Sequence, residues 1–204
     1  MNENPLFHRI ILASASATRA KLLRDAGIPF TPCAPSVDES SLRGALVASQ
    51  ENVDFIAQKL AEAKALDVSK LYPEDIVIGS DQVLIFEDQV LGKCTNLSDA
   101  AKQLKAMRGK SHRLLTAVVL ACGTDILWRH TEVCTLQMRA FSDAFLESYL
   151  NSEGEDILSA VGCYFFEGRG LQLFEKTDAE YFSILGLPLL SLLNALRDLK
   201  VIDQ

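Results

Sequence analysis

The sequence lacks a C-x-x-C pair, a long apolar run and any excess of positive charge. Its five cysteines are odd in number and widely spaced: Cys33, Cys94, Cys122, Cys134 and Cys163. This usage argues against a disulfide framework and against a zinc site. No apolar run reaches the length of a membrane span, and residues 1–9 contain no signal-peptide core. We therefore expect a reduced, cytoplasmic protein.

The charge balance is acidic, with a net charge of -7 and an isoelectric point near 5.0. Such a surface repels nucleic acids and anionic membranes, so we expect neither as a partner. A nucleotide substrate remains open, because an acidic protein can still contain a local basic pocket. The 204 residues, 49% of them hydrophobic, suffice for one buried core. We expect a single domain over residues 1–204, with room for two lobes around a cleft.

Strand-like and helix-like patterns alternate along the chain, without repeats, low-complexity segments or a linker. The expected strands cover residues 10–13, 30–34, 76–78, 83–86, 114–121, 126–138 and 171–174. The expected helices cover residues 17–26, 52–66, 98–107, 142–150 and 188–199. Residues 35–39 are expected to form a loop, and residues 88–89 to turn a hairpin. This order predicts an α/β protein with a mixed, elongated sheet.

The first expected strand ends in two serines, Ser14 and Ser16, and a helix with Arg19 in its first turn follows. Free backbone N–H groups at a helix N-terminus, serine hydroxyls and an arginine together suit the binding of phosphate. The simpler interpretation is that Ser16 only caps the helix. Taken alone, this stretch favours the capping interpretation.

Further charged residues stand at expected strand ends or in loops, where catalytic groups often lie: Asp38, Glu39, Asp81 and Lys93. Lys64 lies late in the expected second helix. Two separated carboxylates and two lysines suit metal-assisted attack on a phosphoanhydride, because carboxylates hold Mg²⁺ and lysines neutralise phosphates.

Each of these residues also has a simpler interpretation. Lys64 and Lys93 can be solvated surface residues, and Glu39 an ordinary loop residue. Asp81, after an apolar strand, is harder to explain in this way, because a partly dry carboxylate needs a partner. His112 precedes a strand, so we expect a structural histidine with a supporting role at most.

Six short motifs, in this order, resemble the Maf family of nucleotide pyrophosphatases over nearly the whole chain. They are Ser14-Ala15-Ser16-Ala17-Thr18-Arg19, Val37-Asp38-Glu39, Lys64-Ala65, Gly79-Ser80-Asp81, Gly92-Lys93 and Gly186-Leu187-Pro188-Leu189. The resemblance implies an elongated fold like that of inosine triphosphate pyrophosphatases, with a central cleft. It also implies cleavage of a nucleoside triphosphate to the monophosphate and pyrophosphate with a divalent metal, Mg²⁺ or alternatively Mn²⁺ or Co²⁺.

The resemblance also implies roles for individual residues. Asp81 corresponds to the proton acceptor, and Glu39 to an acidic residue that holds the metal or its water, so both are expected metal ligands. The expected phosphate-binding residues are Ser14, Ser16, Arg19, Lys64 and Lys93, and Lys93 is also expected to assist catalysis. Related enzymes are often dimers, so a homodimer is one expectation.

The resemblance is closer to the branch that acts on 7-methyl-GTP, because Gln82 follows Asp81 and Glu167 precedes a glycine. The Watson–Crick edge of guanine presents two adjacent donors beside an acceptor, so Glu167 can accept from both and Gln82 can donate to O6. Methylation at N7 makes the base cationic and strengthens its hydrogen bonds to an anion. Thr18 stands at a third specificity position, where this branch resembles a tryptophan site, and threonine cannot stack on a base.

We therefore expect a house-cleaning hydrolase that removes 7-methyl-GTP. Two alternatives stay open: a dTTP/UTP pyrophosphatase of the same family, and a nucleotide-binding regulator of division or septum formation with little turnover. Because Asp81 and Lys93 are both present, the enzyme interpretation is favoured.

Overall fold

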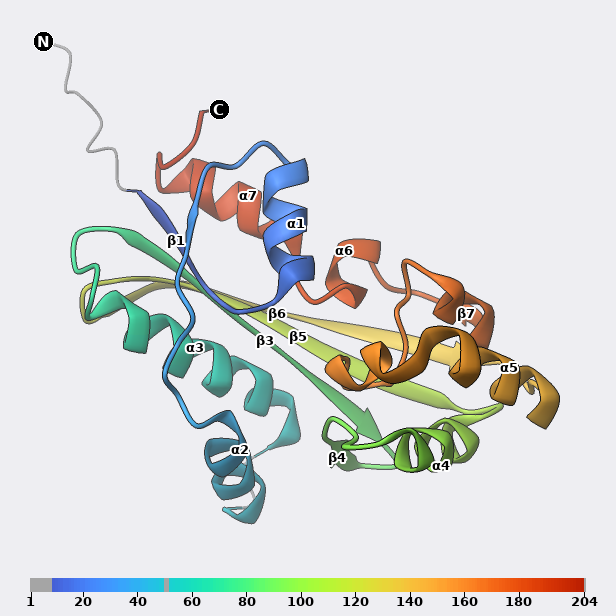
Figure 1. Ribbon diagram of the computed structural model, residues 1–204. Coiled ribbons are helices and arrows are strands. Elements are labelled where there is room, and N and C mark those ends of the chain that lie inside the picture. The colour runs from blue at the N-terminus through green and yellow to red at the C-terminus, as the bar shows by residue number, and fades with distance from the viewer. Residues whose placement is uncertain (1–8, 50–51, 204) are drawn as a thin grey trace, which may run out of the picture. The chain divides into compact units, whose positions relative to one another are not determined.

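The computed structural model describes residues 9–49 and 52–203 (Figure 1). Its strands are β1 (Ile10–Ala13), β2 (Thr31–Pro32), β3 (Ile76–Phe86), β4 (Gln89–Leu91), β5 (Ser111–Cys122), β6 (Asp125–Met138) and β7 (Phe174–Thr177). Its α-helices are α1 (Ala17–Asp25), α2 (Glu39–Ala48), α3 (Ile56–Ser69), α4 (Leu97–Met107), α5 (Asp143–Glu153), α6 (Tyr181–Ile184) and α7 (Leu189–Asp198). Short 3₁₀ turns cover Val53–Phe55, Gly154–Ser159 and Arg169–Leu173.

The seven described strands form one mixed sheet in the order β2-β1-β3-β5-β6-β7, with β4 paired to β3. Strand β1 pairs in parallel with β2 and β3, whereas β3–β4 and β6–β7 are antiparallel. The prediction of a mixed α/β fold is therefore confirmed. No helix within the described ranges is both long enough and apolar enough to cross a membrane.

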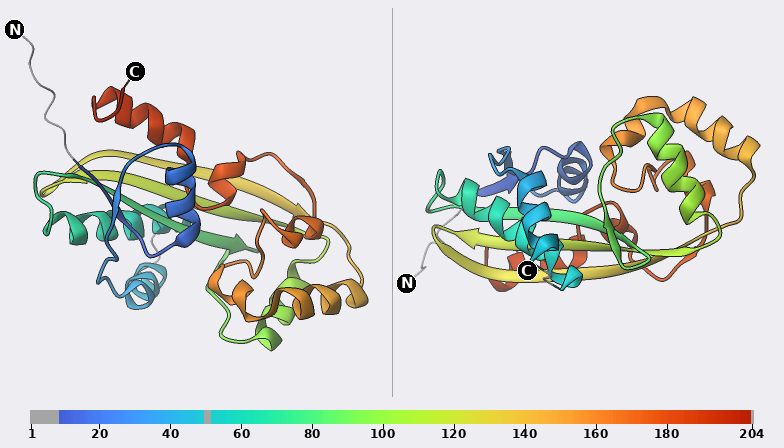
Figure 2. Two further views of the ribbon diagram at one scale, coloured as in Figure 1. Left: turned by 45° about the horizontal axis from the view of Figure 1, so that its top comes forward. Right: turned by 90° about the horizontal axis from the view of Figure 1, so that it is seen from below.

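The chain divides into two compact units. Of the described residues, the first comprises 9–49, 52–81, 116–132 and 186–203, and the second comprises 82–115 and 133–185. In the first unit, α3 packs against α2 and against the buried strand β1, whose four residues are all apolar (Figure 1). In the second unit, α4 packs against α5, as the right-hand view of Figure 2 shows.

Several predicted boundaries are wrong. The expected strands at 76–78 and 83–86 are one continuous strand, so Asp81 lies inside β3 rather than after a strand end. Gly79 and Ser80 do not interrupt the strand, because their small side chains fit a buried, extended backbone. The hairpin turn lies at Glu87 and Asp88, both with positive φ, one residue before the predicted position.

Two further corrections concern segments without a clear period. Residues 171–174 were expected to form a strand, but Arg169–Leu173 is a 3₁₀ turn and β7 begins at Phe174. The expected loop at 35–39 ends in a helix, because the Asp38 side chain accepts a hydrogen bond from the Ser41 N–H and caps α2. Helices α2 and α6 were missed, because neither has a long apolar period.

Candidate functional site

The β1–α1 loop is fixed by its two serines. The side chain of Ser16 caps α1 by accepting from the Arg19 N–H at 3.3 Å. The Ser16 N–H donates in turn to the Oγ of Ser14 at 3.2 Å, and Ser14 is buried. Ser16 therefore caps α1, and its expected role in phosphate binding stays a prediction. The loop also leaves the N-terminal end of α1 in the geometry that binds anions in other proteins.

The guanidinium of Arg19 is held in place by two acceptors. Its Nε donates to the Gly186 carbonyl at 2.8 Å, and its Nη1 donates to Ser14 Oγ at 3.2 Å. The Gly186 carbonyl also accepts from Ser80 Oγ at 3.0 Å. Gly186 has a φ of +100°, which favours glycine at this position. Arg19 is thus fixed by backbone and hydroxyl groups rather than by a carboxylate.

Burial lowers the pKa of Arg19 from its ordinary value, and the charges of Asp81 and Glu39 act in the opposite direction. An arginine stays protonated despite such a shift. Within the described part of the chain, no carboxylate is in direct contact with the Arg19 guanidinium, so this group retains much of its attraction for an incoming anion.

Lys64 lies between two carboxylates. Its Nζ is 2.6 Å from Asp81 Oδ1 and 2.9 Å from Glu39 Oε2. The side chains of Lys64 and Asp81 are each 5% exposed, whereas that of Glu39 is 42% exposed. Lys64 is therefore not the solvated surface residue that a helical position usually implies. It partly balances the charge of two carboxylates, one buried and one facing solvent.

Gly79 allows this arrangement. A Cβ at Gly79 would overlap the carbonyl oxygen of Ala61 and lie 2.7 Å from the Cβ of Ala65. The absent side chain lets α3 approach β3 closely, one turn from Lys64. Asp81, two residues along β3, lies on the same face of the strand as Gly79. The close approach therefore brings the ammonium and the carboxylate together.

Glu39 and Asp81 also fit the metal that the sequence led us to expect. The Oδ2 atom of Asp81 is buried and has no hydrogen-bond partner among the described residues. Within the same part of the chain, no group of three or more His, Cys, Asp or Glu side chains is arranged to hold a metal. Mg²⁺ commonly uses one or two protein carboxylates together with phosphate oxygens and water. The two carboxylates of Glu39 and Asp81 match the protein part of this donor set.

Thr18, Lys93 and Glu167 lie outside this cluster of contacts. Thr18 is half-buried in α1. In the second unit, Lys93 is exposed in the loop after β4, and Glu167 is exposed just before the 3₁₀ turn. Their predicted roles stay predictions, as do the phosphate roles of Ser14, Ser16, Arg19 and Lys64.

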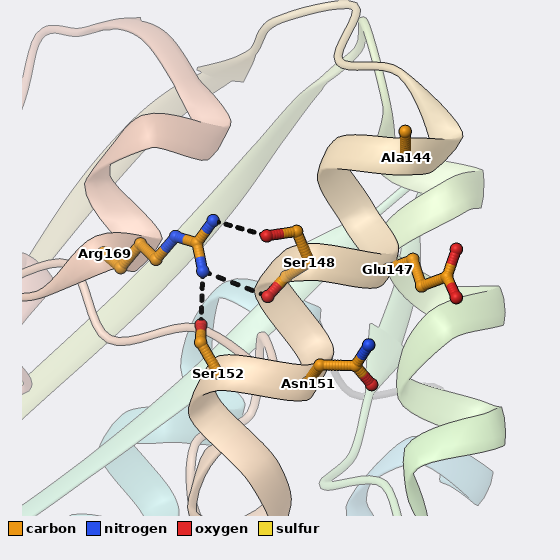
Figure 3. A pocket seen from close by; sticks show the side chains of 6 residues that line it. All are labelled: Ala144, Glu147, Ser148, Asn151, Ser152 and Arg169. Carbon is orange, nitrogen blue, oxygen red and sulfur yellow. Dashed lines mark hydrogen bonds between the residues drawn. The ribbon is translucent and has the colours of Figure 1, made fainter.

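Arg169 anchors the segment that carries Glu167. Its Nη1 donates to Ser148 O at 3.0 Å and to Ser152 Oγ at 2.6 Å, and its Nη2 donates to Ser148 Oγ at 2.8 Å (Figure 3). Its guanidinium also lies 5.8 Å from the centre of the Phe145 ring. These contacts fasten the segment to α5, and they occupy the arginine in the pocket drawn in Figure 3.

The amide of Gln82 is bound within the chain. Its Nε2 donates to the carbonyls of Ser183 at 3.1 Å and Ile184 at 3.0 Å. An amide nitrogen has two hydrogens, and both are used here. Donation to guanine O6 would require one of these bonds to break, so the structure changes our interpretation of what Gln82 does.

His112 is a buried structural residue, as expected. Its Nε2 is 2.7 Å from the Tyr164 hydroxyl, and its ring contacts Phe174. Burial lowers its pKa to about 4, so the ring is neutral at pH 7.

Three residues that sequence reasoning did not single out contribute to these arrangements. They are Ser80, whose hydroxyl joins Ala117 O and Gly186 O; Arg169; and Glu180, whose Oε2 accepts from Ser183 Oγ. The small pair Gly79-Ser80 within an apolar run was the available signal for Ser80. Glu180 has no comparable signal in the sequence, because its partner Ser183 belongs to α6, a helix too short to show an apolar period.

The comparisons with known proteins agree with these observations. The family described as "Maf-like protein" matches residues 9–199. A nucleoside triphosphate pyrophosphatase of Ruegeria sp. (strain TM1040) is 48% identical over 96% of this chain and 98% of its own length. A 7-methyl-GTP pyrophosphatase of Brucella suis is 44% identical over the same shares, and one of Rhizobium meliloti is 42% identical over 95% and 98%. The chain therefore belongs to the Maf family.

Proposed function

We propose that this chain hydrolyses 7-methyl-GTP to 7-methyl-GMP and pyrophosphate. The chain is a nucleoside triphosphate pyrophosphatase of the Maf family, a hydrolase that acts on phosphoanhydride bonds. The choice of nucleotide is the proposed part. It is supported by relatives named for 7-methyl-GTP at 42% and 44% identity and by the exposed carboxylate of Glu167, which suits the donors of a guanine edge.

The cluster around Asp81 carries the chemical proposal. Oδ1 of Asp81 is held by Lys64, and its buried Oδ2 has no partner among the described residues. This second oxygen is the atom that we expect to accept a proton from the attacking water. As this proton passes to Asp81 Oδ2, the water oxygen forms a new bond to phosphorus, the P–O bond that bridges the α- and β-phosphates breaks, and pyrophosphate leaves.

The phosphates are bound by other groups of the chain. In this proposal, Arg19 and the N–H groups at the start of α1 bind the triphosphate. Lys93, in the second unit, keeps its expected role in phosphate binding and catalysis. Lys64 keeps the carboxylates of Glu39 and Asp81 oriented and shares their charge. A divalent cation, when bound by Glu39 and Asp81, would supply further neutralisation of phosphate charge.

We place this activity in the cytoplasm, because all five cysteines of the structure are free thiols. The partner is the small-molecule nucleotide itself. A homodimer remains an expectation, which light scattering coupled to size-exclusion chromatography would test.

The decisive experiment measures pyrophosphate release from 7-methyl-GTP, GTP, UTP and dTTP with Mg²⁺. We expect 7-methyl-GTP to have the highest kcat/KM. Asp81→Asn should lower kcat by about 10²-fold or more, because it removes the proton acceptor and keeps the shape. The matched control is Asp125→Asn, an exposed aspartate at the start of β6. Near wild-type turnover in Asp81→Asn would contradict the role of Asp81.

The base preference is tested by Glu167→Gln. This change should lower activity on 7-methyl-GTP and spare or raise activity on UTP and dTTP, because an amide no longer accepts from both guanine donors. A wild-type enzyme that hydrolyses UTP or dTTP much faster, with that ratio unchanged in Glu167→Gln, would support the pyrimidine alternative. Nucleotide binding without turnover would support the regulator alternative.

A further inference from the structure

Helix α6 is attached to β3 through the side chain of Gln82. The two bonds from Gln82 Nε2 reach consecutive carbonyls, Ser183 O and Ile184 O, at 3.1 and 3.0 Å. Ser183 is buried. Because both amide hydrogens end on helix α6, Gln82 fixes the position of this four-residue helix in the second unit.

The residue just before α6 is Glu180, and its two carboxylate oxygens have different surroundings. Oε2 accepts from the Ser183 hydroxyl at 2.9 Å. Oε1 is buried and has no hydrogen-bond partner among the described residues. A buried carboxylate oxygen without a donor is unfavourable, because no hydrogen bond replaces its lost hydration. Such an atom is suited to a ligand that brings a donor or a positive charge.

The residue after Glu180 is aromatic, and its ring packs against the segment that carries Glu167. The ring of Tyr181 is 6.2 Å from that of Phe166, and Phe166 precedes Glu167. The segments 166–167 and 180–181 therefore lie against each other. Tyr181 is 46% exposed, which leaves part of a large ring available to solvent. An exposed aromatic ring near carboxylates, here those of Glu167 and Glu180, is a combination that binds flat organic cations.

We propose that Glu180 is a specificity-determining residue that recognises the positive charge of the 7-methylated base, and that Gln82 is a positioning residue acting through α6. The inference rests on the proposed function and deepens it. Glu167 then selects the guanine edge, and Glu180 distinguishes 7-methyl-GTP from GTP, which has the same edge without the charge. A neutral pyrimidine base has no positive charge for the Glu180 carboxylate to stabilise.

The test compares kcat/KM for 7-methyl-GTP, GTP and UTP in wild type and in Glu180→Gln. Glutamine keeps the size and can still accept from Ser183 Oγ, but it has no charge. We expect the ratio of 7-methyl-GTP to GTP to fall about 10-fold or more, as for the loss of a charge-assisted bond, mainly through KM. GTP and UTP should each change by less than about 3-fold. Glu175→Gln, an exposed glutamate on β7, is the matched control.

Gln82→Met tests the positioning role, because it removes both amide hydrogens and keeps the length of the side chain. It should lower the same ratio. The double variant Gln82→Met/Glu180→Gln should lose little beyond Glu180→Gln alone, because both changes act on one contact. Additive losses would remove Gln82 from the proposal.

An unchanged ratio in a folded Glu180→Gln variant would overturn the proposal, and so would an equal loss for all three nucleotides. The wild-type ratios decide the proposed function separately. If wild type shows no preference for 7-methyl-GTP, calorimetric binding of 7-methyl-GMP and GMP decides the role of Glu180. Tighter binding of 7-methyl-GMP that Glu180→Gln abolishes would uphold Glu180 while the proposed function fails. Equal binding would reject both.

Discussion

The variant Lys64→Met removes one ammonium from the cluster of Glu39, Lys64 and Asp81 and keeps the length and apolar stem of the side chain. Lys64 Nζ is 2.6 Å from Asp81 Oδ1, and both side chains are 5% exposed. Without the ammonium, Asp81 is a buried carboxylate that has lost its ion pair with Lys64. We expect the folded state to be strongly destabilised for this reason.

The magnitude follows from the geometry. At 2.6 Å and an effective dielectric constant of about 20, the attraction between unit charges is about 6 kcal/mol before desolvation is subtracted. Breaking a buried pair by removing one partner costs roughly 3–5 kcal/mol. Replacing both partners with apolar residues is close to neutral. Lys64→Met/Asp81→Leu should therefore be at least about 2 kcal/mol more stable than Lys64→Met alone.

Urea unfolding followed by tryptophan fluorescence provides the measurement. The sequence has one tryptophan, Trp128, and it lies in the same unit as Lys64. With an m-value of about 2 kcal/mol/M, a loss of roughly 3–5 kcal/mol lowers the midpoint by roughly 1.5–2.5 M. Lys70→Met, an exposed lysine just after α3, is the matched control and should shift the midpoint very little.

A Lys64→Met variant that loses less than about 1 kcal/mol of unfolding free energy would contradict this prediction. So would a double variant that is no more stable than the single one. Either result would mean that the Asp81 carboxylate does not depend on Lys64 in the folded protein.

Arg19, His112 and Gly79 can each be tested by a single substitution. Arg19→Lys should raise KM about 10-fold or more, because lysine loses the hydrogen bond to Gly186 O. The factor should be similar for every nucleotide, because phosphate contacts do not depend on the base, and a change in base preference would contradict this. Burial lowers the pKa of His112 to about 4, so protonation of this ring favours the unfolded state. Wild type should therefore lose roughly 3 kcal/mol of unfolding free energy as the pH falls from about 6.5 to 4. The His112→Gln variant should lose less over the same pH range, as measured by urea unfolding at each pH. Gly79→Ala should lower the free energy of unfolding by about 1–3 kcal/mol and reduce kcat, because a Cβ there pushes α3 and Lys64 away from β3. Wild-type values for both quantities would contradict the close approach of α3 to β3.

Local signals predicted much of the fold. The capping serines Ser16 and Ser142, the glycine after α1 and the long alternating pattern of β6 each act within a few residues. Elements with such signals were found close to their true bounds. Helix α6 has four residues and no period, and it is stabilised by Gln82, about a hundred positions earlier in the chain.

The candidate site was predicted in its residues but not in its arrangement. Lys64 matched a family motif, yet its helical position indicated a solvated side chain. Its burial depends on Asp81, which is 17 residues away, and on the missing side chain of Gly79. The hydrogen bonds of the Gln82 amide could not be predicted from the sequence either, because their acceptors are backbone carbonyls, which every residue has.

The Gly186 carbonyl, which accepts from Arg19 and from Ser80, has a consequence for biosynthesis. Arg19 and Gly186 are 167 residues apart. At a translation rate of roughly 5–20 residues per second, about 10–30 s pass between the synthesis of the arginine and that of its acceptor. Throughout this interval, α1 can form but its arginine has no carbonyl to bind. A growing chain therefore cannot assemble the Arg19 anchor, and an interrupted chain that ends before Gly186 never does.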